Sequence, residues 1–153
     1  MIRLLTGSTH TGKTLLAQRL LERHGAPYLS IDHLKMGLIR SGMCPLTPES
    51  TDEALTAVLW PVVREIVKTA VENGQSLTVE GCYIPFNWRE DFDASCLPHI
   101  RFLCLVFSEA YIRTRFDTIQ THANAIERRK DDSFCTMELL LAENRRNLEA
   151  CRR

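Results

Sequence analysis

The chain has 153 residues, enough for one hydrophobic core and too few for two ordinary domains. Its 44% hydrophobic and 25% charged residues exclude the disordered and membrane-embedded classes of protein. Because 19 Lys and Arg balance 19 Asp and Glu, no net charge draws the chain onto nucleic acid or an anionic membrane, and any anion site must be local.

The cysteines and the first residues bear on the compartment. No two of the six cysteines form a Cys-x-x-Cys pair and none lies beside a histidine at zinc spacing, so free, buried thiols are expected. The first apolar run ends at Gly7, which is not typical of a secretory leader, and no apolar stretch approaches the ~20 residues of a membrane span. We therefore expect a cytoplasmic protein without a membrane partner.

Four short apolar runs have the length and composition of strands: 2–6, 27–31, 76–80 and 100–107. The last run is apolar enough to predict a strand that is buried on both faces. Helical patterns lie between these runs, and such alternation predicts an α/β fold, with a parallel four-stranded sheet and helices on both of its faces.

The helical segments differ in strength. Apolar residues at helical spacing predict helices from 14 to 24 and, in a long run that ends at Asn73-Gly74, from 54 to 71. Ser50 and Glu53 form a capping-box pattern before the long run, and Pro61 predicts a kink within it. Weaker patterns are centred on 32–42, 109–120 and 136–150.

Residues 7–14, Gly-Ser-Thr-His-Thr-Gly-Lys-Thr, match the P-loop pattern G-x-x-x-x-G-K-[ST] and lie between a predicted strand and a predicted helix. Two glycines allow the loop to turn its N–H groups toward a phosphate, the lysine reaches the β- and γ-phosphates, and the final hydroxyl is a ligand for Mg²⁺. The alternative is a tight turn before a helix. We predict that the phosphates of Mg-ATP bind Gly7, Ser8, Thr9, His10, Thr11, Gly12, Lys13 and Thr14.

The order of motifs resembles a known group of proteins. A P-loop, a strand ending in Ser-Ile-Asp (30–32), a strand ending in Val-Glu-Gly (79–81) and a helical tail with arginines resemble the small P-loop kinases: adenylate, shikimate and gluconate kinases, chloramphenicol phosphotransferase and zeta toxin. The resemblance implies a three-layer P-loop NTPase fold in one domain, 1–153, with an acceptor-binding insertion at about 33–60 and a helical lid at about 113–135. It also implies phosphoryl transfer from ATP, with Mg²⁺, to a small-molecule hydroxyl or phosphate.

Two carboxylates follow predicted strands, at the edge of a parallel sheet where ligands bind. By resemblance, Asp32 orients the acceptor hydroxyl or removes its proton, which makes it a candidate catalytic residue along with Lys13. The alternative is that Asp32 caps a helix beginning at His33. The resemblance also implies that Glu80 holds Mg²⁺ through water, together with Thr14. A charge that meets solvent at the end of the sheet is the alternative.

The remaining candidates are aromatic or cationic. Tyr83, in an aromatic stretch with Phe86 and Trp88, either lines the acceptor pocket or packs in the core. Arg40 resembles the arginine that grips the acceptor's phosphate or carboxylate, with a solvated surface residue as the alternative. Arg128 and Arg129 match the lid cations that close over the γ-phosphate, unless their charged run is a solvated turn.

A fifth strand, which kinases of this group have after the lid, is not evident in the sequence. Either the strand is absent, the sequence is a piece of a longer chain, or another chain pairs at the open sheet edge. The choice between ATP and GTP therefore stays open. So do three alternatives to a metabolite kinase: an adenylate-type kinase, a zeta-toxin-like nucleotide-sugar kinase and a non-catalytic ATP-binding module. The absence of interleaved aromatic and basic residues disfavours nucleic acid.

Overall fold

Four parallel strands form the centre of the molecule. The computed structural model describes residues 1–122, 126 and 135–152. Its sheet has the order β2-β3-β1-β4, and every adjacent pair is parallel. The strands are β1 (Ile2–Gly7), β2 (Tyr28–Ser30), β3 (Leu77–Glu80) and β4 (Ile100–Leu105). The predicted α/β class and the four-stranded parallel sheet are confirmed.

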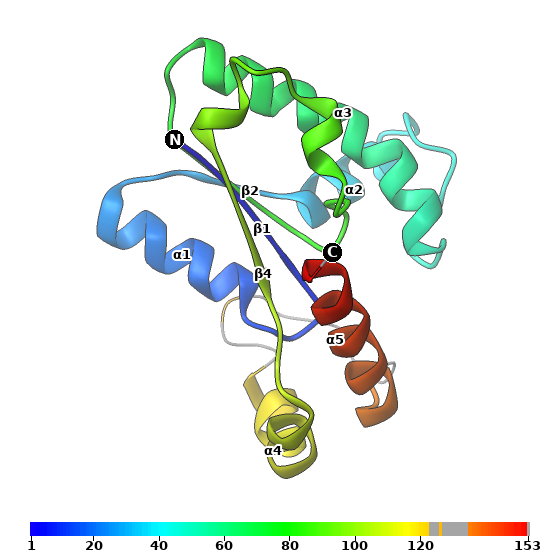
Figure 1. Cartoon of the computed structure of the whole chain (residues 1–153). Coiled ribbons are helices and arrows are strands. Elements are labelled where there is room, and N and C mark those ends of the chain that lie inside the picture. Colours follow the sequence, from blue (N-terminus) through cyan, green and yellow to red (C-terminus); the bar gives the residue numbers. More distant parts are fainter. Residues whose placement is uncertain (123–125, 127–134, 153) are drawn as a thin grey trace.

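Helices cover both faces of this sheet. Figure 1 shows α1 on one side of the strands and α2 and α3 on the other. Helices α4 and α5 pack together beyond the ends of β1 and β4, where the carboxyl edge of the sheet lies. The helices are α1 (Lys13–His24), α2 (Ile31–Arg40), α3 (Asp52–Glu72), α4 (Glu109–Thr121) and α5 (Met137–Cys151), with short 3₁₀ turns at Trp88–Asp91 and Leu97–His99.

The helix ends follow local chemistry. Helix α1 stops at Gly25, whose left-handed φ of 63° lets its N–H donate to the carbonyl of Leu21. The expected cap of α3 is wrong by one residue, because the Thr51 side chain accepts from the N–H of Ala54. The Ser50 hydroxyl instead accepts from the N–H of Thr47, which closes the preceding turn. Helix α3 continues through Pro61 as a single helix.

The main core lies between α3 and the sheet. The buried stripe of α3 includes Leu55, Leu59 and Val63, at most 1% exposed, and it packs with Leu4 and Val79 of the central strands. Each such side chain contributes about 1.5–3 kcal/mol when removed from water. The stripe therefore holds α3 against the sheet and supports the strands whose ends carry the candidate site.

Strand β4 differs from its expectation. It pairs with β1 and, within the described residues, with no other strand. Ile100 is buried, but Leu103 is 43% exposed. The prediction of a strand buried on both faces is therefore wrong beyond Ile100: Arg101 and Leu103 are exposed, because β4 lies at the edge of the sheet, where helices cover a strand less completely than at the centre. Pairing of another chain at this edge stays a prediction.

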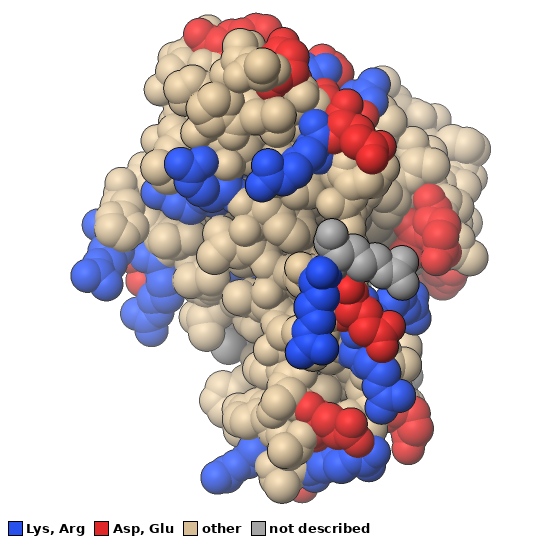
Figure 2. All heavy atoms as spheres, in the orientation of Figure 1, with Lys and Arg blue, Asp and Glu red and all other residues tan. Residues whose placement is uncertain are grey.

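The surface carries both signs of charge. Figure 2 shows lysine and arginine side chains intermixed with aspartate and glutamate over the face drawn. Of the helices in the described part of the chain, none has the length and apolarity needed to cross a bilayer. The six cysteines, all within the described residues, are thiols and form no disulfide, as expected, although only Cys44, Cys96 and Cys135 are buried.

Candidate phosphate and acceptor site

The P-loop joins the end of β1 to the start of α1 and folds around its own lysine. Lys13 is 8% exposed, and its Nζ donates to the carbonyl oxygen of Ser8 at 2.7 Å. The same oxygen accepts from Oγ1 of Thr11 at 2.8 Å. No acidic residue lies in the first turn of α1, so the partial positive charge of this helix end is available to an anion.

Two residues of the loop have a left-handed backbone besides Gly7. Gly12 has φ 83° and immediately precedes α1, and His10, a non-glycine, has φ 63°. Nδ1 of the His10 ring also lies 2.9 Å from the hydroxyl oxygen, Oγ1, of Thr9. Left-handed residues of this kind occur in the anion-binding concavities that successive backbone N–H groups form.

Substitution of Gly7 by alanine is expected to destabilise the fold by about 3 kcal/mol. Gly7 has φ 141°, and a Cβ there would lie 2.3 Å from the carbonyl oxygen of Leu105 on β4. Gly12 is the matched control, because an added Cβ meets nothing within 4 Å. Gly12→Ala should therefore cost only the left-handed strain of about 1–2 kcal/mol. Urea unfolding measures both, and an equal or reversed order would contradict the close approach to β4.

Glu80 ends β3 and is 2% exposed. It pairs in register with Leu5 of β1, two residues before the P-loop begins. The alternative of a charge that meets solvent is therefore wrong. The described residues contain no group of three or more His, Cys, Asp or Glu side chains able to hold a metal. The roles of Thr14 and Glu80 toward Mg²⁺ stay predictions.

Asp32 lies in a cluster with two other side chains. Its Oδ1 accepts from Nζ of Lys35 at 2.7 Å, and the same ammonium donates to the hydroxyl of Tyr83 at 2.9 Å. The ammonium also lies 5.1 Å from the centre of the Tyr83 ring. Ser30 is the residue before α2, and Asp32 lies within the first turn, so Asp32 does not cap a helix that begins at His33.

The protonation of this cluster is fixed by its contacts. Burial alone would lower the pKa of Lys35, but hydrogen bonds to Asp32 and Tyr83 outweigh it and raise that pKa. Burial raises the pKa of Tyr83, against the effect of the Lys35 hydrogen bond. Lys35 therefore stays charged and Tyr83 stays a neutral phenol near pH 7. Half of the Asp32 side chain, 47%, remains exposed and can meet a ligand.

Cys82 relates this cluster to the P-loop. Its Sγ donates to the carbonyl oxygen of Gly7 at 3.4 Å. Although the residue as a whole is exposed, burial of the sulfur raises the pKa of the Cys82 thiol. The charges of Lys13 and Asp32 also act on it, in opposite directions. The first residue of the P-loop therefore contacts a residue that follows β3, at the carboxyl edge of the sheet.

The two arginines of α2 and α3 that could bind an acceptor, Arg40 and Arg64, do not join this cluster. Arg40 is exposed at the far end of α2, eight residues from Asp32 and so about 12 Å along the helix axis. Arg64 of α3 pairs with Asp91 at 2.9 Å and with Glu65 at 3.1 Å. Helix α4 is the described part of the predicted lid, and the lid candidates Arg128 and Arg129 lie outside the described residues.

The aromatic stretch after Glu80 divides between the two expected roles. Tyr83 faces Lys35 and is 6% exposed. Trp88 is buried and stacks on Phe102, with ring centres 5.8 Å apart. Phe86 meets the same Phe102 ring edge to face. Both Tyr83 and Trp88 are buried in the main core, and Tyr83 also contacts the Asp32 cluster through Lys35; its role toward an acceptor stays a prediction.

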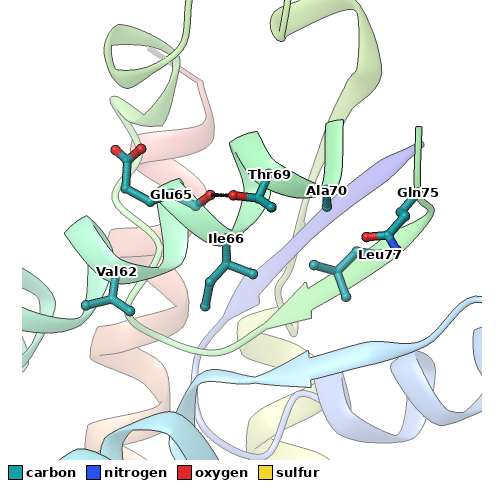
Figure 3. A pocket seen from close by; sticks show the side chains of 7 residues that line it. All are labelled: Val62, Glu65, Ile66, Thr69, Ala70, Gln75 and Leu77. Carbon is teal, nitrogen blue, oxygen red and sulfur yellow. Dashed lines mark hydrogen bonds between the residues drawn. The ribbon is translucent and has the colours of Figure 1, made fainter. Parts of the chain in front are cut away.

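Two hollows lie away from these residues. Figure 3 shows one of about 530 Å³ between α3 and the start of β3, where the side chains of Val62, Ile66 and Leu77 converge. A second, of about 290 Å³, lies beside a break in α4, where Arg115 has non-helical angles. Neither is lined by the P-loop or by the Asp32 cluster.

Comparison with known proteins identifies the fold. No family model and no curated protein matches the sequence. A chain in the structure of the Pnkp1/Rnl/Hen1 RNA repair complex matches with a TM-score of 0.56 and 13% identity, over 97% of this chain and 45% of that one. A candidate kinase from Chloroflexus aurantiacus J-10-fl matches with a TM-score of 0.55 and 22% identity, over 94% of this chain and 78% of that one. The chain shares the α/β fold of these two proteins, with its four-stranded parallel sheet.

A gluconokinase from Sinorhizobium meliloti 1021 also aligns, at 18% identity over 97% of this chain and 91% of that one, with a TM-score of 0.47.

In this chain, the P-loop and Asp32 follow β1 and β2 at the same edge of the sheet. Ligands of open α/β sheets bind at this edge. Sequence reasoning missed Lys35, although its spacing of three residues from Asp32 on a helix is the signal of an ion pair.

Proposed function

We propose that the protein is a P-loop kinase that transfers the γ-phosphoryl group of Mg-ATP to a hydroxyl of a small molecule. One observation carries the proposal: Leu5 of β1 and Ser30 of β2 are both in register with Glu80 of β3, so the P-loop and Asp32 leave their strands at the same level of one sheet edge. A phosphate-binding group and a carboxylate that can accept a proton are thus near each other. Phosphoryl transfer needs both, because the acceptor oxygen loses a proton as it attacks the phosphate.

The roles follow from the contacts. The loop from Gly7 to Thr14 binds the phosphates, with the Lys13 ammonium balancing their charge. The half-exposed Asp32 carboxylate orients the acceptor and takes its proton, and Lys35 and Tyr83 hold that carboxylate in place. The Thr14 hydroxyl and the buried Glu80 carboxylate are oxygen donors of the kind that Mg²⁺ prefers, and bound Mg²⁺ would neutralise charge on the phosphates.

The charges near Asp32 favour a neutral hydroxyl acceptor over a nucleoside monophosphate. An acceptor phosphate needs unpaired cations, preferably arginines that bind it through two hydrogen bonds. Within the described residues, Lys35 is already paired with Asp32, Arg64 is paired with Asp91, and Arg40 lies at the far end of α2. We therefore propose a metabolite alcohol as acceptor, within one domain that has its acceptor helices at about 33–60 and its lid at about 113–135.

A mass-spectrometric screen tests this function. The protein is incubated with Mg-ATP and a pool of sugars, hydroxy acids, amino alcohols, nucleoside monophosphates and nucleotide sugars, and each mass that gains a phosphoryl group is followed. We expect one alcohol to gain phosphate. Phosphate on a nucleoside monophosphate or a nucleotide sugar would replace the proposed acceptor class. Tight ATP binding without any phosphorylated product would contradict the kinase and leave a nucleotide-binding module.

A further inference from the structure

Helix α5 contacts the P-loop across most of the length of the sequence. The N–H of Thr9 donates to Oε2 of Glu143 at 3.3 Å. One helical turn later, Nδ2 of Asn147 donates to the hydroxyl of Ser8 at 3.1 Å. Figure 1 shows α5 beside the loop that leaves β1. Two polar residues of α5, spaced i and i+4 on one face, thus hold two consecutive residues of the P-loop.

Helix α5 is itself held firmly enough to position these contacts. Asn144, next to Glu143, is 3% exposed. Its Oδ1 accepts from the N–H of Phe107 at 2.7 Å, and its Nδ2 donates to the carbonyl of Leu140 at 2.8 Å. Leu140 is fully buried against Ile112 of α4. The helix is therefore anchored to the connection between β4 and α4, which follows the strand beside β1.

The peptide that joins Ser8 to Thr9 is held on both of its sides. Its carbonyl oxygen accepts from Nζ of Lys13 at 2.7 Å, and its N–H donates to Glu143 at 3.3 Å. The C=O and N–H of a trans peptide point in opposite directions, and no peptide bond among the described residues is cis. A carboxylate on the N–H side therefore turns the carbonyl toward Lys13. A charged acceptor makes a stronger hydrogen bond than a neutral one.

We propose that Glu143 is a positioning residue of the phosphate site: it fixes the Ser8–Thr9 peptide so that its carbonyl holds the Lys13 ammonium in place. The effect of Glu143 on catalysis rests on the proposed function, whereas its contact with Thr9 is independent of that function. Glu143 lies on the opposite side of this peptide from Lys13, so it acts through the backbone and not on the phosphates directly. Asn147 assists by holding the Ser8 side chain.

The ionisation of Glu143 provides a direct readout. Burial raises the pKa of Glu143, while the hydrogen bond from Thr9 and the charges of Lys13 and Arg146 lower it and the charge of Asp52 raises it. The carboxylate accepts strongly above this pKa, and the bond to Thr9 weakens as the pH falls through it. The amide proton of Thr9 should therefore change its NMR chemical shift with the ionisation of Glu143.

The first experiment is NMR on the whole chain, in three forms. In the wild type, the Thr9 amide shift is expected to follow a single titration with a midpoint above the ordinary glutamate pKa. In Glu143→Gln that titration disappears, and in Glu143→Ala the Lys13 Nζ resonance shifts as well. Glu149→Ala, which removes an exposed carboxylate of the same helix, should change neither signal. A Thr9 amide that does not titrate in the wild type would overturn the proposal.

ATP titrations then connect the contact to the site. Glu143→Ala is expected to weaken ATP binding by at least about tenfold, the size of one lost hydrogen bond to a charged group. Glu143→Gln keeps an oxygen acceptor and should recover most of the lost ATP affinity. If Glu143 had only a structural role, both variants would lose the same ATP affinity and show the same fall in melting temperature. Unchanged binding in Glu143→Ala would refute the positioning role. If the wild type does not bind ATP, the proposed function fails, and the NMR result alone decides on Glu143.

Discussion

Replacement of Lys13 by alanine is expected to lower phosphoryl transfer by at least about a hundredfold, the usual loss when one electrostatic donor is removed from a reacting centre. The Lys13 ammonium is the cation of the P-loop, and it is already oriented by the carbonyl of Ser8. Its loss removes the charge that stabilises the transferring phosphoryl group. Initial rates with the acceptor found by the screen measure the effect.

The fold should survive this substitution. Lys13 makes one side-chain hydrogen bond among the described residues, and such a bond contributes about 0.5–1.5 kcal/mol. Lys68→Ala is the matched control, because Lys68 is a lysine of α3 whose ammonium pairs with Glu65. It should transfer at the wild-type rate. If Lys13→Ala also kept that rate, the P-loop would have no part in the reaction and the proposed function would be wrong.

Replacement of Asp32 by asparagine is expected to lower phosphoryl transfer by about 10²- to 10⁴-fold while leaving ATP affinity unchanged. Asparagine keeps the shape of the side chain but cannot take the acceptor's proton. Because it also removes the negative charge that pairs with Lys35, at a half-exposed carboxylate, we expect a loss of stability of no more than about 1 kcal/mol. Single-turnover rates and ATP binding, measured below the unfolding transition, separate the two effects.

Two further variants test whether transfer depends on the Asp32 carboxylate itself or on the cation that holds it in place. Lys35→Met removes the cation but leaves the carboxylate, and Asp93→Asn makes the same chemical change as Asp32→Asn in a turn that precedes the 3₁₀ segment Leu97–His99. We expect Lys35→Met to slow transfer less than Asp32→Asn, and Asp93→Asn to leave the rate unchanged. A wild-type rate in Asp32→Asn would remove this residue from the mechanism.

Local patterns predicted the parts of the structure that depend on neighbours in sequence. The strand before the P-loop, the helix after it and its stop at Gly25 all follow from an apolar run, two glycines and helical spacing. The sequence did not show which of two adjacent hydroxyl side chains caps α3. Both Ser50 and Thr51 can cap α3, and only the geometry of the turn before it selects Thr51.

Contacts between distant segments were beyond these patterns. Lys35 joins the candidate site because Tyr83, 48 residues later, returns to it. Glu143 reaches Thr9 over 134 residues. Leu103 is exposed because β4 lies at the edge of the sheet, which its apolar composition does not reveal. In each case the decisive partner is set by the packing of whole elements, and no spacing within the sequence encodes it.

The central place of β1 has a consequence for folding kinetics. This strand precedes the other three in the sequence, yet it pairs with β3 at residues 77–80 and with β4 at residues 100–105. During synthesis its buried residues Ile2, Leu4 and Leu5 therefore have no complete sheet to join until residue 105 has left the ribosome. Such non-local parallel pairing folds slowly and leaves apolar segments open to aggregation. The ability to bind phosphate, which depends on the loop after β1, should accordingly appear late in folding.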